Sequence, residues 1–162
     1  MGGPALIDGR LVNATDNFHK ANFVVDGISY CSSENYFQCV KCIDSEEREH
    51  VRMSGPDWGA WRAGSTVKLR PDWEKIKVRT MYTGCKSKYK QNPDLKAELT
   101  STKGEIKFNA SATFWCLWNE KITTLLREEL KEPDQRNEAI INDIWHQIQK
   151  YEEQNDLVTC DG

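Results

Sequence analysis

The chain has 162 residues, 38% hydrophobic and 29% charged, which is the composition of a single globular domain, and its net charge of −3 disfavours polyanionic partners. No apolar run approaches the roughly 20 residues of a membrane helix, and the first residues lack a basic start and an apolar signal core. We therefore expect no membrane partner and an intracellular protein, cytoplasmic or nuclear.

Turn and cap signals divide the first half of the chain into a hairpin and three helices. Asp26-Gly27 between two short apolar runs predicts a β-hairpin of residues 23–25 and 28–30. Ser32 or Ser33 then suits the cap of a helix from Glu34 to about Ile43. Two further helices are expected, one from Asp44 or Ser45 to before Gly55-Pro56 and one over Trp58–Ala63, ending at Gly64.

The second half favours helices. Pro71 suits the first turn of a long helix, and Asn92-Pro93 ends it. Its mostly apolar stripe comprises Trp73, Ile76, Thr80, Met81, Cys85 and Tyr89. After it we expect a short helix to about Thr100, a strand over 105–108, a helix over 118–130 limited by Pro133, and a final docked helix within 134–154. The fold class is therefore α+β: a mostly helical single domain with a small β-hairpin.

Charge is unevenly distributed along the chain. Residues 131–156 hold three basic and seven acidic residues, so the acidity belongs mainly to the C-terminal part. Residues 62–90, the basic band, hold nine basic residues against Asp72 and Glu74. The band is either a solvated helix face or a surface that attracts phosphates, and both interpretations stay open.

The six cysteines favour reduced, mostly buried thiols over disulfides, because no secretory signal is present. Cys39 and Cys42 form a CxxC pattern, but no second cysteine or histidine pair follows at zinc spacing. We expect no metal site and no cofactor.

The segment Ser33–Lys41 is the most informative for chemistry. At about 100° per residue, Gln38 and Lys41 lie about 40° and 20° from Glu34 around a helix axis. A carboxylate, an amide and an amine thus share one stripe near a helix N-terminus, where anionic groups are favoured. The alternative is an ordinary exposed polar face with a weak salt bridge.

Two aromatic segments are further candidates. Trp73 beside Arg70 offers a flat face for a base and a fork for a phosphate, although Trp73 also begins the core stripe. The segment Phe114–Trp118 contains three aromatic residues and is either core or the lid of a pocket.

Four motifs in this order resemble those of the NADAR family, whose YbiA-like members are N-glycosidases. They are Asn17-Phe18, VVDGISYCSSENYFQCVK at 24–41, LRPDWEKIKVRTM at 69–81 and KYKQNPDLKAEL at 88–99, with Gly64 between the second and the third. The resemblance covers about residues 15–130 and implies a YbiA-like fold. It leaves residues 1–14 as an N-terminal segment and 131–162 as an acidic C-terminal helical extension.

The family cleaves the C–N bond at the anomeric carbon of a ribose, in phosphorylated riboflavin-pathway intermediates or in ADP-ribosylated guanine. The resemblance implies Glu34 as the essential glutamate, Lys41 as the helix lysine and Trp73 as the base-stacking tryptophan. We hypothesise that Glu34 is the acid/base and that Lys41 attacks C1 to form a Schiff base. Further substrate contacts are expected from Asn17, Phe18, Tyr36, Gln38, Arg70 and Trp115.

Two departures from the family pattern affect the expected substrate. Relatives carry an acidic residue where this chain has Ala112, and a glycine-rich loop where it has the short Cys116–Asn119. We therefore expect removal of ADP-ribose from guanine, as a nucleoside or in DNA or RNA. The alternatives are hydrolysis of ribosylaminopyrimidine phosphates and a catalytically weakened module that binds ADP-ribose or a nucleotide.

Overall fold

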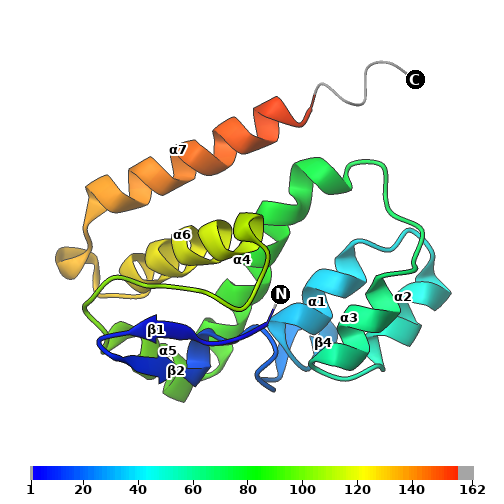
Figure 1. Ribbon diagram of the computed structural model, residues 1–162, viewed down its shortest axis with the longest axis horizontal. Coiled ribbons are helices and arrows are strands. Elements are labelled where there is room, and N and C mark those ends of the chain that lie inside the picture. Colours follow the sequence, from blue (N-terminus) through cyan, green and yellow to red (C-terminus); the bar gives the residue numbers. More distant parts are fainter. Residues whose placement is uncertain (1, 157–162) are drawn as a thin grey trace.

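The computed structural model describes residues 2–156 and has one long central helix, α4 (Trp73–Gln91), between two groups of elements (Figure 1). One group contains α1 (Ser33–Val40), α2 (Ser45–Arg52) and α3 (Trp58–Gly64). The other contains α5 (Pro93–Thr100), α6 (Thr113–Glu129) and α7 (Glu138–Gln154). Short 3-10 helices lie at Asn13–Thr15 (η1) and Pro133–Gln135 (η2). The expected α+β class with a predominance of helix is confirmed.

Two antiparallel hairpins supply the strands. The predicted hairpin is confirmed as β3 (Phe23–Val25) and β4 (Ile28–Tyr30), with positive φ at Asp26 (51°) and Gly27 (78°) as its two-residue turn requires. A hairpin of β1 (Ala5–Ile7) and β2 (Arg10–Val12) was not predicted. The same Asp-Gly signal stands at its turn, so the sequence contained the information.

The number of α-helices in the described residues is as predicted, but several helices begin or end at other residues than expected. Asp44 caps α2 as expected: its Oδ1 accepts from the backbone N–H groups of Glu46 (2.7 Å) and Glu47 (3.1 Å). The helix α1 ends at Val40 rather than near Ile43. The stripe of α4 is buried as predicted, with Ile76 half-buried at its edge.

Two local predictions are wrong. Residues 105–108 form no strand and make a single bridge, in which the backbone groups of Leu6 and Lys107 exchange two hydrogen bonds (2.8 and 3.1 Å). The helix α6 begins at Thr113, so Cys116–Asn119 lie inside a helix rather than in a connection. Trp115 and Trp118, one turn apart, are both buried, and this packing favours the helix where local propensity does not.

The final helix docks as predicted, across α4 and α6 (Figure 1). Ile141, Ile144 and Ile148 are buried in the core, and the Trp145 indole donates to the Glu129 carboxylate (3.1 Å). Two acidic residues of the C-terminal part pair with the basic band: Glu152 with Arg79 (2.7 Å) and Asp156 with Lys75 (2.9 Å). The C-terminal acidity therefore offsets part of the band.

The cysteines of the described residues are unpaired, as expected. Cys39, Cys42 and Cys85 are buried, whereas Cys31 and Cys116 are half-buried. Burial raises the pKa of the Cys39 thiol to about 12, which keeps it protonated and unreactive near neutral pH. Cys160 lies outside the described residues.

Truncation of Ile148 tests whether α7 unfolds together with the rest of the chain. We expect Ile148→Ala to lower the free energy of unfolding by about 2 to 4 kcal/mol in a single transition, because it empties a fully buried site. Urea denaturation followed by circular dichroism measures this. Ile43→Ala is the control, since Ile43 is 45% exposed. A separate early transition for the C-terminal part would contradict the expectation.

Candidate active site

The candidate site is built on the first turn of α1. The Ser32 hydroxyl caps the helix by accepting from the backbone N–H of Asn35 (2.9 Å) and donates to the carbonyl of Pro56 (2.6 Å). The Asn35 amide donates to three carbonyl groups at the end of α2 and in the loop after it. These contacts fix the start of α1 and hence the direction of Glu34.

The polar row of α1 is largely buried, which excludes the ordinary exposed face. Glu34 is 0% exposed, and its Oε1 accepts a hydrogen bond of 2.7 Å from the Gln38 amide. The Oε1 of Gln38 has no hydrogen-bond partner among the described residues. This oxygen lies against Gly64, where an added Cβ would come within 2.0 Å of it. Gly64 thus leaves room for the amide that holds the carboxylate.

Lys41 stands at the C-terminal end of α1 and is half-buried. Burial lowers the pKa of its ammonium group, and the negative charge of Glu34 opposes this shift in part. A lowered pKa increases the fraction of neutral amine, which is the form that attacks an electrophilic carbon. The site therefore contains a buried carboxylate in the first turn of α1 and an amine of lowered pKa at the C-terminal end of that helix.

Gln38 and Lys41 reach a cavity of about 190 Å³, which we call the lysine chamber. Aromatic rings form much of its wall, and two lysines supply amine groups. Its lining residues are Phe37, Gln38, Lys41, Trp61, Ser65, Trp73, Lys77 and Trp115. An aromatic wall with amine and amide groups suits a sugar that carries a charged substituent.

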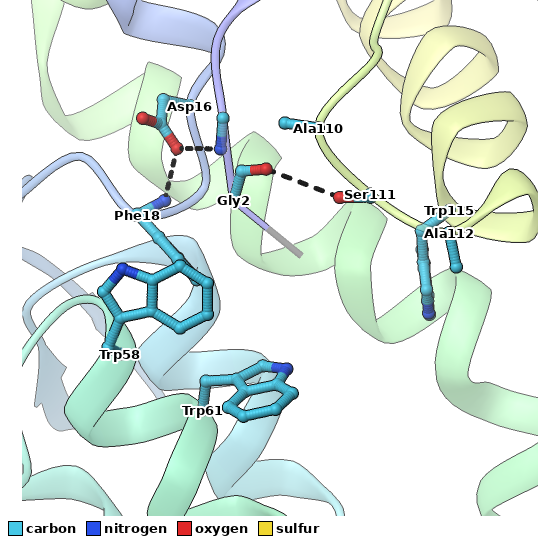
Figure 2. A pocket seen from close by; sticks show the side chains of 10 residues that line it. Gly2, Asp16, Phe18, Trp58, Trp61, Ala110, Ser111, Ala112 and Trp115 are labelled. Carbon is cyan, nitrogen blue, oxygen red and sulfur yellow. Dashed lines mark hydrogen bonds between the residues drawn. The ribbon is translucent and has the colours of Figure 1, made fainter.

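A second cavity of about 490 Å³, the tryptophan chamber, adjoins the first, because Trp61 and Trp115 line both. Figure 2 shows Trp58 and Trp61 of α3 on one side of it and Trp115 of α6 on the other. The remaining lining residues are Gly2, Gly3, Asp16, Phe18, Ala110, Ser111 and Ala112. Ala112, where relatives are expected to carry an acid, thus faces this chamber and leaves it apolar there.

The structure brings five of the predicted site residues to these chambers: Lys41, Gln38, Trp73, Trp115 and Phe18. The other four lie elsewhere. Glu34 and Asn17 are buried and line neither chamber, and the backbone N–H of Glu34 donates to the Asn17 carbonyl (3.0 Å). Tyr36 and Arg70 line a separate cavity of about 310 Å³. Arg70 is engaged there by a two-pronged ion pair with Asp72 (2.6 and 3.0 Å).

A buried lysine in α4 fixes the segment that carries Asn17 and Phe18. The Nζ of Lys88 donates to the Ala14 carbonyl (2.7 Å), and the Tyr89 hydroxyl donates to the same oxygen (2.9 Å). Burial lowers the pKa of Lys88. The KYKQN motif of the sequence therefore has a structural role, in that it anchors η1 and the residues that follow it.

Sequence reasoning missed Trp58 and Trp61. They occupy positions i and i+3 of α3, so they share one helix face, and both are largely exposed. Two large aromatic residues on the open face of a short helix are a usable signal for a ligand site. Their relation to Trp115, more than 50 positions further along the chain, depends on the tertiary structure.

Among residues 2–156, no group of three His, Cys, Asp or Glu side chains has the arrangement of a metal site. In the same range, no helix combines the length and apolarity needed to cross a membrane.

Comparison with known families decides the relationship. The family model of the NADAR domain matches residues 10–131. This chain belongs to the NADAR domain family. The resemblance of the four sequence motifs to the NADAR family is thereby confirmed.

Named relatives share parts of this NADAR protein. It is 34% identical over 88 residues to the N-glycosidase YbiA of Escherichia coli, covering 53% of this chain and 55% of that protein. It is 27% identical over 129 residues to a riboflavin biosynthesis protein of Vibrio vulnificus, covering 72% of this chain and 35% of that protein. The chain thus spans about half the length of the curated YbiA proteins that it matches.

A solved relative supports the fold. The NMR structure of Escherichia coli YbiA superposes with a TM-score of 0.65 at 26% identity, covering 72% of this chain and 77% of that one. The expected YbiA-like fold is confirmed.

A double-mutant cycle tests whether Gly64 holds Gln38 in place. We expect Gly64→Ala to cost about 1 to 3 kcal/mol of unfolding free energy, because the new methyl group overlaps the Gln38 amide. In a Gln38→Ala background the cost should be smaller, since the overlapping amide is gone. Urea denaturation of the four proteins measures both values. Equal costs in the two backgrounds would contradict this contact.

Proposed function

We propose that this NADAR protein is an N-glycosidase that hydrolyses the bond between C1 of a ribose and a base nitrogen, with ADP-ribosylated guanine as its substrate. The observation that carries the proposal is the buried Glu34–Gln38 pair leading to Lys41 in a chamber walled by aromatic residues. The name of the related N-glycosidase YbiA supports the reaction class.

Lys41 supplies the nucleophile in this proposal. Its neutral amine attacks C1, the C1–N bond to the base breaks, and the base leaves with the electron pair and a proton from the attacking nitrogen. The ribose ring then opens at its C1–O bond: the nitrogen lone pair forms the C=N bond, and the ring oxygen takes the C–O electron pair and a proton from a general acid, which gives a protonated Schiff base. Water adds to C1, the free sugar and the amine are released, and the proton returns to the conjugate base of that acid. The balance is one water consumed per bond cleaved.

Glu34 acts first through its charge. The positive charge that develops on the sugar and then on the imine is stabilised by a carboxylate held in a region from which water is excluded. Glu34 does not line either chamber. Direct proton exchange with the substrate therefore requires the Gln38 side chain to rotate away from the Oε1 atom of Glu34. In this proposal Glu34 then serves as the acid/base.

The size of the adjoining space favours the larger substrate. The lysine chamber of about 190 Å³ opens beside a tryptophan chamber of about 490 Å³, which together provide room for a sugar and a two-ring base. The reaction needs no cofactor in this scheme, and the guanine is a nucleoside or part of DNA or RNA.

Two other functions each have an observation in their favour. The matches to riboflavin biosynthesis proteins of Vibrio vulnificus and Arabidopsis thaliana favour a ribosylaminopyrimidine phosphate as substrate. Ala112 leaves the tryptophan chamber without an acid at that position, which favours a weakened module that binds ADP-ribose or a nucleotide. Turnover of one substrate but not the other separates the first two, and binding without turnover identifies the third.

Turnover assays test the proposed reaction. Purified protein is incubated with ADP-ribosylated guanosine and with the ribosylaminopyrimidine phosphate, and release of the free sugar is followed by chromatography. We expect turnover of the first substrate and a loss of about 100-fold or more in Glu34→Gln and Lys41→Ala, because each removes a group that acts on the sugar.

Matched control variants are Glu46→Gln and Lys96→Ala, whose side chains are exposed and line neither chamber. Full activity of Lys41→Ala would remove the covalent route while leaving Glu34 in place. Absence of turnover together with binding of ADP-ribose would replace the enzyme by a binding module.

The pH dependence of Schiff-base trapping tests the state of Lys41. Ribose 5-phosphate and cyanoborohydride should label Lys41 with a half-maximal rate below pH 10.5, since burial lowers the pKa of this amine. Glu34→Gln should move the midpoint to still lower pH, because the lost negative charge favoured the ammonium form. Mass spectrometry of the adduct measures both. A midpoint that rises in Glu34→Gln would contradict the electrostatic coupling.

A further inference from the structure

Two tryptophans on α3 have exposed side chains. Trp58 is 58% exposed and Trp61 is 42% exposed. Their ring centroids are 5.7 Å apart at an interplanar angle of 82°, and Phe18 meets Trp58 edge-on at 5.1 Å. The three rings hold one another at fixed angles. An ordered group of exposed aromatic rings is a preformed surface for a flat ligand.

These rings face the tryptophan chamber, and the negative charge of Asp16 in its lining disfavours the binding of a phosphate. Trp58 and Trp61 stand opposite Trp115 across the chamber in Figure 2. Asp16 is the one charged residue among the described residues that line it. The Asp16 carboxylate accepts hydrogen bonds from the backbone N–H groups of Gly3 (2.8 Å) and Phe18 (2.9 Å), so its position is fixed. A fixed negative charge repels an anion and tolerates the N–H groups of a base.

The adjoining lysine chamber has the opposite polarity. Lys41 and Lys77 line it. Lys77 pairs with Glu74 (2.7 Å) and lies 4.6 Å from the centre of the Phe114 ring, which holds the ammonium group near the chamber. The Lys77 ammonium group beside Gln38 and Ser65 suits a sugar with a phosphate group. The polarity changes at Trp61 and Trp115, the two residues that line both chambers.

From this change of polarity we infer that Trp58 and Trp61 form the stacking site of the leaving base, while the sugar and its phosphate occupy the lysine chamber. The inference rests on the proposed function and assigns its two substrate halves to two places. In this assignment Trp73, which the family resemblance implied as the base-stacking residue, lines the chamber of the sugar instead. The glycosidic bond then lies between Trp61 and Trp115, within reach of the chamber that contains Lys41. Trp58 lines only the tryptophan chamber and Lys77 only the lysine chamber, so each half has its own marker.

Binding of two fragments tests the assignment without turnover. Guanosine carries the base without a phosphate, and ribose 5-phosphate carries the phosphate without a base. Ligand affinities of the full chain are measured by NMR titration. Trp58→Ala should weaken guanosine binding about 10-fold, as expected for one stacking contact, and leave ribose 5-phosphate binding unchanged. Lys77→Ala should have the reverse effect.

Two further variants serve as controls. Trp58→Phe should retain most of the guanosine affinity, because a ring remains available for stacking. Met53→Ala is the control for loss of an exposed apolar side chain, since Met53 is 72% exposed and lines neither chamber. Its affinities should equal those of the wild type.

The outcomes separate this inference from the proposed function. Equal guanosine affinity in wild type and Trp58→Ala, or no guanosine binding at all, overturns the stacking site while the turnover assay still stands by itself. Guanosine binding that depends on Trp58, together with no hydrolysis of either substrate, supports the stacking site and overturns the N-glycosidase. Loss of both ligands in Trp58→Ala overturns the division into two halves.

Discussion

Burial of a carboxylate at the start of α1 is the constraint on which the site depends. Glu34 is fully buried, and an isolated charge in that position would be costly unless hydrogen bonds compensate it. The Gln38 amide supplies one of these bonds, and Gly64 provides the space that the amide needs. The backbone of Glu34 is tied to Asn17, whose segment is anchored in turn by Lys88 through Ala14. Residues far apart in the chain thus serve one carboxylate.

The residues of the basic band that lie on the central helix α4 have different contacts. Lys77 lines the lysine chamber and pairs with Glu74, whereas Lys75 and Arg79 pair with Asp156 and Glu152 near the C-terminal end of the described residues. Lys88 is fully buried and bonds to a backbone carbonyl. Part of the positive charge of this band is therefore paired within the protein. The part that remains beside the site is local, which suits one phosphorylated sugar better than a long polyanion.

The two chambers differ in the chemistry that they can support. The lysine chamber combines an amine of lowered pKa with an amide oxygen of Gln38 that has no hydrogen-bond partner within residues 2–156. The tryptophan chamber combines aromatic rings with a fixed carboxylate. Ala112 contributes no acidic group to the second chamber. A mechanism centred on α1 needs no acid at position 112, because Glu34 lies in that helix and Lys41 directly follows its last residue. A mechanism that requires a second carboxylate at position 112 is incompatible with Ala112.

The sequence by itself determined the local elements and the shared direction of three side chains. Asp-Gly turns, the caps Ser32 and Asp44, and the periodic stripe of α4 are short-range effects, since each depends on residues within a few positions. The same periodicity put Glu34 on one stripe with Gln38 and Lys41. Only the tertiary structure decided that Glu34 is buried, that Arg70 faces a different cavity, and that Trp58 and Trp61 meet Trp115. It also extended α6 back to Thr113 and reduced residues 105–108 to one bridge, because packing between distant segments decides burial and weak local preferences.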